Sequence, residues 1–191
     1  MRAAGIGALL VGSLLLAGCQ RPAAPDGDQA AAAPSTRASA SGEMRVGRPT
    51  RIAIPAIGVE ARVVAVGLRA DGAMEVPDVD LAGWYQPGPR PGERGPAVIV
   101  GHVDSRSGPA VFYALNQLRT GDRIVVGQDG TPARVFSVER LERQPKGALP
   151  VGRIWNRTGA PVLRLITCGG SFDRSTGHYR DNLIVYASLA S

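Results

Sequence analysis

Cys168 is the residue of this sequence best suited to covalent chemistry. It follows the apolar run of residues 162–167 and precedes Gly169 and Gly170. A strand over that run would carry the thiol to a rim, where the glycines leave the sulfur and the neighbouring amides accessible. A thiol is only slightly ionised near neutral pH, so its use as a nucleophile requires a nearby base or cation. The alternative is that Cys168 packs as a small buried hydrophobic residue.

His102 and Arg180 are the candidate partners of that thiol. His102 follows a short apolar run and so also lies at a strand end, whereas the other histidine, His178, falls in residues 171–179, which we expect to form a loop. Arg180 stands at the head of the last apolar run. A guanidinium held there would stabilise the negative charge that acyl transfer develops on a carbonyl oxygen. The strands that hold Cys168 and Arg180 are consecutive, so we expect them to be antiparallel neighbours.

Two other interpretations of these residues stay open. A single histidine at the end of a strand is often structural or simply exposed at the surface. Metal binding by Cys168, His102 and His178 is the second alternative, but the three residues lack the spacing of known metal sites.

The elements that must position these side chains are short strands. The apolar segments are rich in Val and Ile and are separated by Gly, Pro, Asn or Asp, which is typical of strands joined by turns. Seven or eight strands in about 140 residues favour an all-β fold with a small closed or nearly closed barrel. Helical patterns are sparse, with two or three turns expected over residues 109–118 and one turn over residues 149–155. The expected strands are residues 51–54, 59–66, 97–100, 123–126, 133–138, 162–167 and 183–189.

The N-terminal part of the chain predicts export. Residues 3–17 are uncharged and rich in Leu, too short to cross a bilayer as a helix but suited to a secretory signal. The sequence Leu16-Ala17-Gly18-Cys19 resembles a bacterial lipobox, in which a lipid on Cys19 would hold the chain on the outer face of the membrane. We therefore expect a signal peptide over residues 1–18, a disordered tether rich in Ala, Pro and Ser over residues 19–49, and a folded domain over residues 50–191.

Export affects how the cysteines and the charge are interpreted. The chain has two cysteines, so lipidation of Cys19 would leave Cys168 without a disulfide partner outside the cell. A conventional or uncleaved signal with an incidental Cys19 is the alternative. The excess of 22 basic over 16 acidic residues does not predict nucleic-acid binding, because the basic residues lack interleaved aromatic side chains. We interpret it as a solvated Arg-rich surface, with anionic lipids or wall polymers as the alternative neighbours.

The segments around the three candidate residues resemble the sortase family. Leu165-Ile166-Thr167-Cys168 resembles the sortase nucleophile motif T-L-x-T-C. The segments Gly83-Trp84-Tyr85, Gly101-His102-Val103-Asp104 and Tyr179-Arg180-Asp181-Asn182-Leu183 are similar to those of class F sortases. The resemblance covers about residues 51–189. Arg164 departs from it, because many relatives have the first Thr of the motif at this position.

This resemblance implies a closed eight-stranded sortase-type β-barrel with one or two short helices. It also implies a cysteine transpeptidase in which Cys168 is the nucleophile, His102 the proton donor and acceptor, and Arg180 the group that stabilises the oxyanion. Thr167 would help to shape the oxyanion site. The reactive form in sortases is a thiolate paired with imidazolium. Asp104 could orient His102, but we favour a solvated surface carboxylate.

The partners implied by the resemblance are surface proteins with a C-terminal LPxTG-like sorting signal and an amine such as a cell-wall precursor. Residues 141–160 would form one wall of the peptide groove. No calcium-binding cluster of carboxylates occurs there, so we expect neither a metal nor another cofactor. A cysteine peptidase that only hydrolyses peptides, and a lipoprotein that keeps an inactive barrel as a binding module, are the alternative functions.

Overall fold

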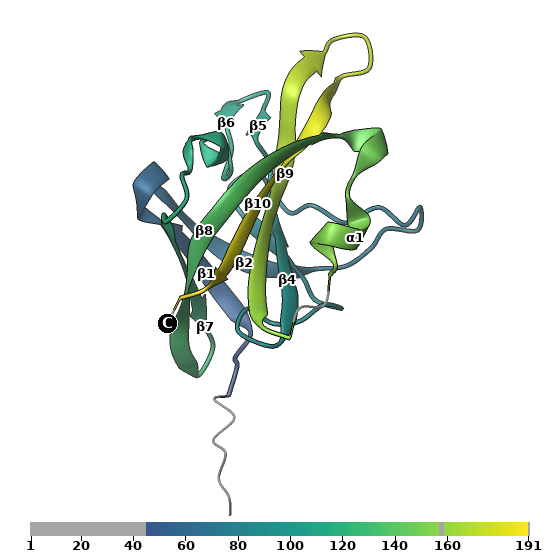
Figure 1. The fold of residues 1–191 in the computed structure, drawn as a ribbon. Coiled ribbons are helices and arrows are strands. Elements are labelled where there is room, and N and C mark those ends of the chain that lie inside the picture. The colour runs from purple at the N-terminus through teal and green to yellow at the C-terminus, as the bar shows by residue number, and fades with distance from the viewer. Residues whose placement is uncertain (1–44, 157–158, 191) are drawn as a thin grey trace, which may run out of the picture. The chain divides into compact units, whose positions relative to one another are not determined.

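Eight strands, several of them rich in Val and Ile, close into a barrel in the computed structural model of the protein, which describes residues 45–156 and 159–190 (Figure 1). The expected signal peptide, Cys19 and the tether up to residue 44 lie outside the described residues. Within the described part, no helix is long and apolar enough to cross a membrane.

The barrel follows the strand order β1-β2-β3-β4-β9-β10-β8-β7, and β7 pairs with β1 to close it. Two neighbouring pairs, β2 with β3 and β4 with β9, are parallel, and the other pairs are antiparallel. The barrel strands are β1 (Pro49–Ile54), β2 (Val59–Val66), β3 (Ala82–Tyr85), β4 (Gly95–Val100), β7 (Arg123–Gln128), β8 (Thr131–Pro145), β9 (Pro161–Asp173) and β10 (His178–Leu189).

The remaining elements are short. A two-stranded sheet of β5 (Asp104–Ser105) and β6 (Gly108–Pro109) lies at the end of the barrel where the β9–β10 hairpin projects, and α1 (Val151–Ile154) lies outside the barrel wall (Figure 1). Three 3-10 turns complete the fold, at Pro55–Ile57, Leu115–Gln117 and Lys146–Ala148.

Side-chain alternation divides the apolar residues between two faces of the wall, as it must in a strand. In β9, Leu163 and Leu165 point into the main core inside the barrel, whereas Ile166 packs on the outer face. In β10, Val185 belongs to the inside and Ile184 to the outside. The outer cluster is covered by the segment between β8 and β9, which contributes its buried residue Ile154 from α1. The barrel wall near the candidate site is therefore buried on both sides.

The predicted eight-stranded β-barrel is confirmed, and each of the seven expected strands lies within an observed one. The sequence analysis missed β3. It was wrong about residues 171–179, because β9 continues to Asp173 and β10 begins at His178, so only residues 174–177 form the turn. It was also wrong about a helix over residues 109–118: only a 3-10 turn forms there, and Phe112 and Leu115 are nevertheless fully buried. The single turn expected near residues 149–155 is confirmed as α1.

Candidate active site

Cys168 lies within β9, on the outer face of the barrel wall, and not at the strand end that the sequence analysis expected, because pairing with β10 continues the strand to Asp173. Thr167 points inward and is buried, so alternation along the strand turns Cys168 to the same face as Ile166. The thiol is free and half-buried. Directly opposite it on β10 is Asn182. Thus Cys168 is accessible and unpaired, as nucleophilic chemistry requires.

The parallel pairing of β4 with β9 brings the backbone of His102 toward that of Cys168. The register aligns Val100 with Ile166, and two further residues along each chain lead to His102 and Cys168. The contact continues past the strand, because the amide of Gly101 donates a hydrogen bond to the Ile166 carbonyl at 3.2 Å. Parallel neighbours that share a register position also share a face. If the alternation of β4 continued for two residues past Val100, the His102 side chain would share the outer face with Cys168.

Thr167 holds these two segments together. Its hydroxyl donates a buried hydrogen bond of 2.8 Å to the carbonyl of Gly101. Gly101 itself leaves no room for a side chain, since a Cβ there would lie 2.7 Å from Val111 and Phe112. The residues directly before His102 and Cys168, Gly101 and Thr167, thus fix how closely the two chain segments approach.

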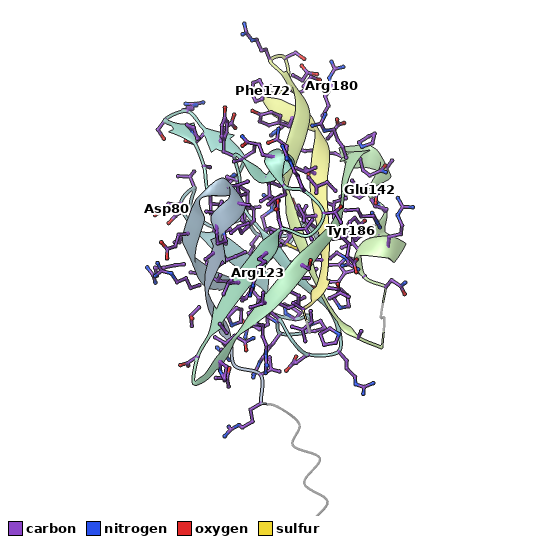
Figure 2. All side chains as sticks on the ribbon, turned by 60° about the vertical axis from the view of Figure 1, so that its left-hand side comes forward. Asp80, Arg123, Glu142, Phe172, Arg180 and Tyr186 are labelled. Carbon is purple, nitrogen blue, oxygen red and sulfur yellow. The ribbon has the colours of Figure 1, made fainter. Side chains whose placement is uncertain are left out.

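Arg180 lies in β10, close to the turn of the β9–β10 hairpin. It lies two residues before Asn182 on β10, and Figure 2 shows it at the end of the barrel where the hairpin projects. Its guanidinium donates to the carboxylate of Asp173 at 3.3 Å, and its side chain is 68% exposed. Such an exposed ion pair contributes little free energy and costs little to break, but in this structure the Arg180 guanidinium binds Asp173.

Asp104 and Tyr179 form a pair close to the same site. The Tyr179 hydroxyl donates a hydrogen bond to the Asp104 carboxylate. This bond to an acceptor, together with burial and the charge of Asp104, raises the pKa of Tyr179 to about 12, and Cys168 and Tyr113 add smaller contributions. Asp104 is therefore neither simply solvated, as the sequence analysis favoured, nor bonded to His102: its partner is Tyr179.

A cavity of about 240 Å³ lies at the barrel mouth behind Cys168. Its lining includes the chain from Thr167 to Gly170, Tyr179, and Arg143 from β8. His102 and Arg180 do not line this cavity; His102 borders a separate hollow formed with residues 64–66 and 75–81. The sequence analysis missed Arg143, because nothing in a run of alternating charges indicates which arginine reaches the site.

Arg164, the departure from the family motif, is explained by a stack on the outer face. It is 5% exposed and lies over one face of the Tyr186 ring, with its guanidinium carbon 4.6 Å from the ring centre, while that of Arg140 lies 3.5 Å from the same centre. Burial lowers the pKa of Arg164. Arg164 lies directly opposite Tyr186 in the β9–β10 pairing, four residues before Cys168 along β9.

Glu142 ties the segment that covers this stack to the barrel wall. Its carboxylate accepts hydrogen bonds from Arg140 at 2.7 Å, from Gln144 at 2.7 Å and from Arg153 of α1. Burial would raise the pKa of Glu142, but these hydrogen bonds outweigh it and lower the value to about 2. Figure 2 shows Glu142 and Tyr186 close together on the same side of the barrel. An ionic contact thus ties α1 to β8, and the groove wall expected over residues 141–160 stays a prediction.

The last candidate, His178, begins β10 and is exposed. Among residues 45–156 and 159–190, no group of three or more His, Cys, Asp or Glu side chains is arranged to hold a metal ion.

Comparison with known families gives one match. The family model described as "Sortase domain" matches residues 52–190, most of the chain. No protein of curated function matches the chain significantly in sequence.

Several solved structures are similar in fold. Sortase C-1 from Actinomyces oris is 21% identical, with a TM-score of 0.58 over 74% of this chain and 71% of that one. The sortase D5 transpeptidase of Clostridium perfringens is 20% identical, with a TM-score of 0.55 over 78% of this chain and 83% of that one. Sortase A from Corynebacterium diphtheriae is 17% identical, with a TM-score of 0.57 over 77% of this chain and 62% of that one.

Proposed function

The chain belongs to the sortase family, and we propose that it is an exported cysteine transpeptidase of the class F type that acts through Cys168. Membership of the family implies transpeptidase activity. The observation that carries the proposal for this chain is the register of β4 and β9, together with the Thr167–Gly101 hydrogen bond, which supports a thiol and an imidazole side by side on one face.

In the proposed reaction, the thiolate of Cys168 attacks the carbonyl carbon at the scissile bond of a sorting peptide. His102 first acts as an acid and gives a proton to the leaving amine, which leaves a thioester on Cys168. Arg180, released from Asp173, stabilises the negative charge on the carbonyl oxygen, and the segment around Thr167 shapes the oxyanion site. An incoming amine then opens the thioester.

The proposed substrates are surface proteins with a C-terminal LPxTG-like signal, and the proposed acceptor is an amine such as a cell-wall precursor. The peptide would bind on the outer face that Cys168 and His102 share. In this proposal the segment between β8 and β9 forms one wall of the peptide groove. The Glu142–Arg153 contact supports this placement, because it ties that segment to the barrel over the outer cluster. Nucleic acid is not a proposed partner, and no metal or cofactor enters the proposed reaction.

We further propose that Cys19 carries a lipid and that the chain from Cys19 to residue 45 acts as a tether, so that the barrel works close to the outer face of the membrane. The expected tether to residue 49 is too long, because residues 46–48 hydrogen-bond to the barrel and Pro49 begins β1. Mass spectrometry of the membrane-associated protein tests this: a diacylglycerol mass on a chain that begins at Cys19 is expected. A chain cleaved elsewhere, or one that is not modified, would contradict the lipid anchor without affecting the proposed chemistry.

The chemistry is tested by mixing the protein with a library of LPxTG-like peptides and a glycine-type amine. Intact-mass measurement should detect a thioester in the wild-type protein and none in Cys168→Ala. Cleavage without a ligated product would favour a peptidase that only hydrolyses. If Cys168→Ala retained the biological activity of the wild-type protein, the barrel would be a binding module and the proposal would be wrong.

A further inference from the structure

The end of the β9–β10 hairpin projects beyond the barrel, and Arg180 lies in this projecting part (Figure 1). The pairing of β10 with β8 stops at Asp181, and the pairing of β9 with β4 stops at Ile166. Within the described part of the chain, no other strand therefore pairs with residues 171–179. The position of Arg180 depends on how this hairpin end is held.

A β-bulge lies at the base of the hairpin end. Two residues of β9, Gly170 and Ser171, lie opposite the single residue Arg180 of β10. Gly170 has a φ of 76°, in the left-handed region that favours glycine. A bulge of this kind bends a strand and changes the direction of the side chains next to it. The barrel pairing alone therefore does not set the direction of the hairpin end, and a contact beyond the bulge is needed to fix it.

One side-chain contact ties the hairpin end to the rest of the molecule. The Tyr179 hydroxyl donates a hydrogen bond to the carboxylate of Asp104 in β5. Among residues 45–156 and 159–190, this is the one hydrogen bond that joins residues 171–179 to a residue outside β9 and β10. A carboxylate acceptor makes such a bond stronger than one between neutral groups. The raised pKa of Tyr179, about 12, keeps the proton on the hydroxyl at neutral pH.

Asp104 belongs to a segment whose backbone is fixed independently of the hairpin. It pairs with Pro109 in the two-stranded sheet of β5 and β6. Two residues before it, the carbonyl of His102 accepts a hydrogen bond of 2.9 Å from the amide of Phe112. The Tyr179–Asp104 bond therefore connects the hairpin end to the segment that carries the candidate imidazole.

Tyr179 and Arg180 are consecutive residues of β10, so they point to opposite faces of the strand. Asn182 lies opposite Cys168 and shares its face, and Arg180 is two residues from Asn182 along β10. Alternation thus gives Arg180 the face of the thiol, while Tyr179 points to the other face, where it meets Asp104. A contact made by Tyr179 can hold the backbone of Arg180 without occupying the site.

We propose that Tyr179 and Asp104 are positioning residues, which hold the hairpin end so that Arg180 lies within reach of the carbonyl that Cys168 attacks. The inference rests on the proposed function. The Tyr179 hydroxyl does not touch the substrate and acts through Arg180. In this structure Arg180 binds Asp173 through an exposed ion pair that costs little to break. With the backbone held in place, only the side chain of Arg180 has to move.

The first test removes the hydrogen bond and keeps the ring. Tyr179→Phe retains the edge-to-face contact with Phe172, whose ring centre lies 5.2 Å away. The rate of thioester formation with an LPxTG-like peptide should fall about 10-fold, the order expected when a hydrogen bond to a charged group is lost. Asp104→Ala should have a similar effect, and the double variant should be no slower than the single ones, because both remove the same bond. Asp104→Asn keeps an acceptor and should retain part of the rate.

The second test separates positioning of Arg180 from a merely structural role. If the hydroxyl acts through Arg180, Tyr179→Phe should change the rate in the Arg180→Ala background by less than about 2-fold. An equal loss in both backgrounds would show an effect independent of Arg180 and would overturn the inference. Tyr113→Phe is the matched control, because this exposed tyrosine lines the same cavity as Tyr179, and it should react like the wild type.

Amide hydrogen exchange measures the hairpin end without relying on activity. Loss of the Tyr179 hydroxyl should speed exchange over residues 171–179, because the remaining contacts of this segment lie within the hairpin. Exchange as slow as in the wild type would show that the bond does not hold the hairpin end.

These measurements also separate the inference from the proposed function. A protein that forms the thioester equally fast with and without the Tyr179 hydroxyl contradicts the positioning pair alone. If Arg180→Ala formed the thioester as fast as the wild type, the proposed role of Arg180 would be wrong and the inference would fail with it. The absence of any thioester on Cys168 contradicts the proposed function itself.

Discussion

The hydroxyl of Thr167 donates a hydrogen bond to the carbonyl of Gly101 at 2.8 Å, and each of these residues directly precedes a candidate catalytic side chain. The bond joins the residue just after the end of β4 to the middle of β9, one residue beyond the last β4–β9 pair, Val100 with Ile166. It therefore limits the distance between the backbones of Cys168 and His102, whatever rotamers the two side chains adopt.

Replacing Thr167 tests this link. Thr167→Val keeps the shape of the side chain but leaves the buried carbonyl of Gly101 without its hydroxyl donor, so the free energy of unfolding should fall by about 1–3 kcal/mol. The rate of thioester formation should fall as well, because the two strand ends are no longer tied. Thr167→Ser keeps the donor and should retain most of both. Urea unfolding and intact-mass kinetics measure the two effects; a Val variant as active as the wild type would contradict the link.

The two histidines provide a matched pair for testing proton transfer. His102→Gln should lower kcat/KM for peptide cleavage by about 10²–10⁴-fold, the usual contribution of general acid–base catalysis. His178→Gln should leave cleavage unchanged, because His178 is exposed at the start of β10. Steady-state cleavage of a sorting peptide measures both variants. Equal losses in the two variants, or no loss in His102→Gln, would exclude His102 as the proton donor.

Arg180 should matter for turnover and not for stability. Its side chain is 68% exposed and makes one ion pair, with Asp173 at 3.3 Å, which contributes little to the free energy of unfolding. Arg180→Ala should reduce turnover by roughly two to three decades with folding retained. Arg174→Ala, in the turn of the same hairpin, is the control. Full activity in Arg180→Ala would show that this guanidinium does not stabilise the oxyanion.

The Glu142 carboxylate predicts an acid-sensitive contribution to stability. Its pKa is about 2 in the folded chain, against an ordinary value of 4.5. The folded state therefore favours the ionised form, so the stabilisation is complete above about pH 4.5 and is lost as the pH falls from there through about 2. Glu142→Gln should lower the free energy of unfolding at pH 7, and the difference from the wild type should shrink toward pH 3. Glu139→Gln, an exposed neighbour on β8, should show no such trend in urea titrations at pH 7, 4 and 3.

Much of the barrel could be predicted because β-branched residues mark its strands. β4 and residues 183–186 of β10 are continuous apolar runs that fit a wall covered on both faces. β3 escaped detection because Ala82–Tyr85 is four residues long and contains a glycine. The hairpin ends of β9 and β10 were not predicted, because Gly169, Gly170 and Asp173 have low strand propensity. Pairing between the two strands overrides this propensity.

The candidate site could be predicted only in part, for a related reason. Cys168 and His102 both follow recognisable apolar runs. The expected strand end is found for His102, just beyond β4, but Cys168 lies within β9, which continues to Asp173. Arg143 lies in the second half of β8, which continues to Pro145, seven residues beyond the expected end at residue 138. The charge-rich residues 140–145, beyond the expected end of the strand, pair with β10 through the backbone, and no side-chain pattern indicates such pairing.

On the proposed chemistry, the alignment of β4 with β9 would also determine the stage of folding at which the protein becomes reactive. Gly101 and Thr167 are 66 residues apart in the chain, and contacts of such long range form slowly because the intervening chain must first be ordered. A nascent or partly unfolded chain therefore exposes a lone thiol with no imidazole next to it. On the proposed chemistry, catalytic competence is acquired at the end of folding, and incomplete molecules do not consume substrate.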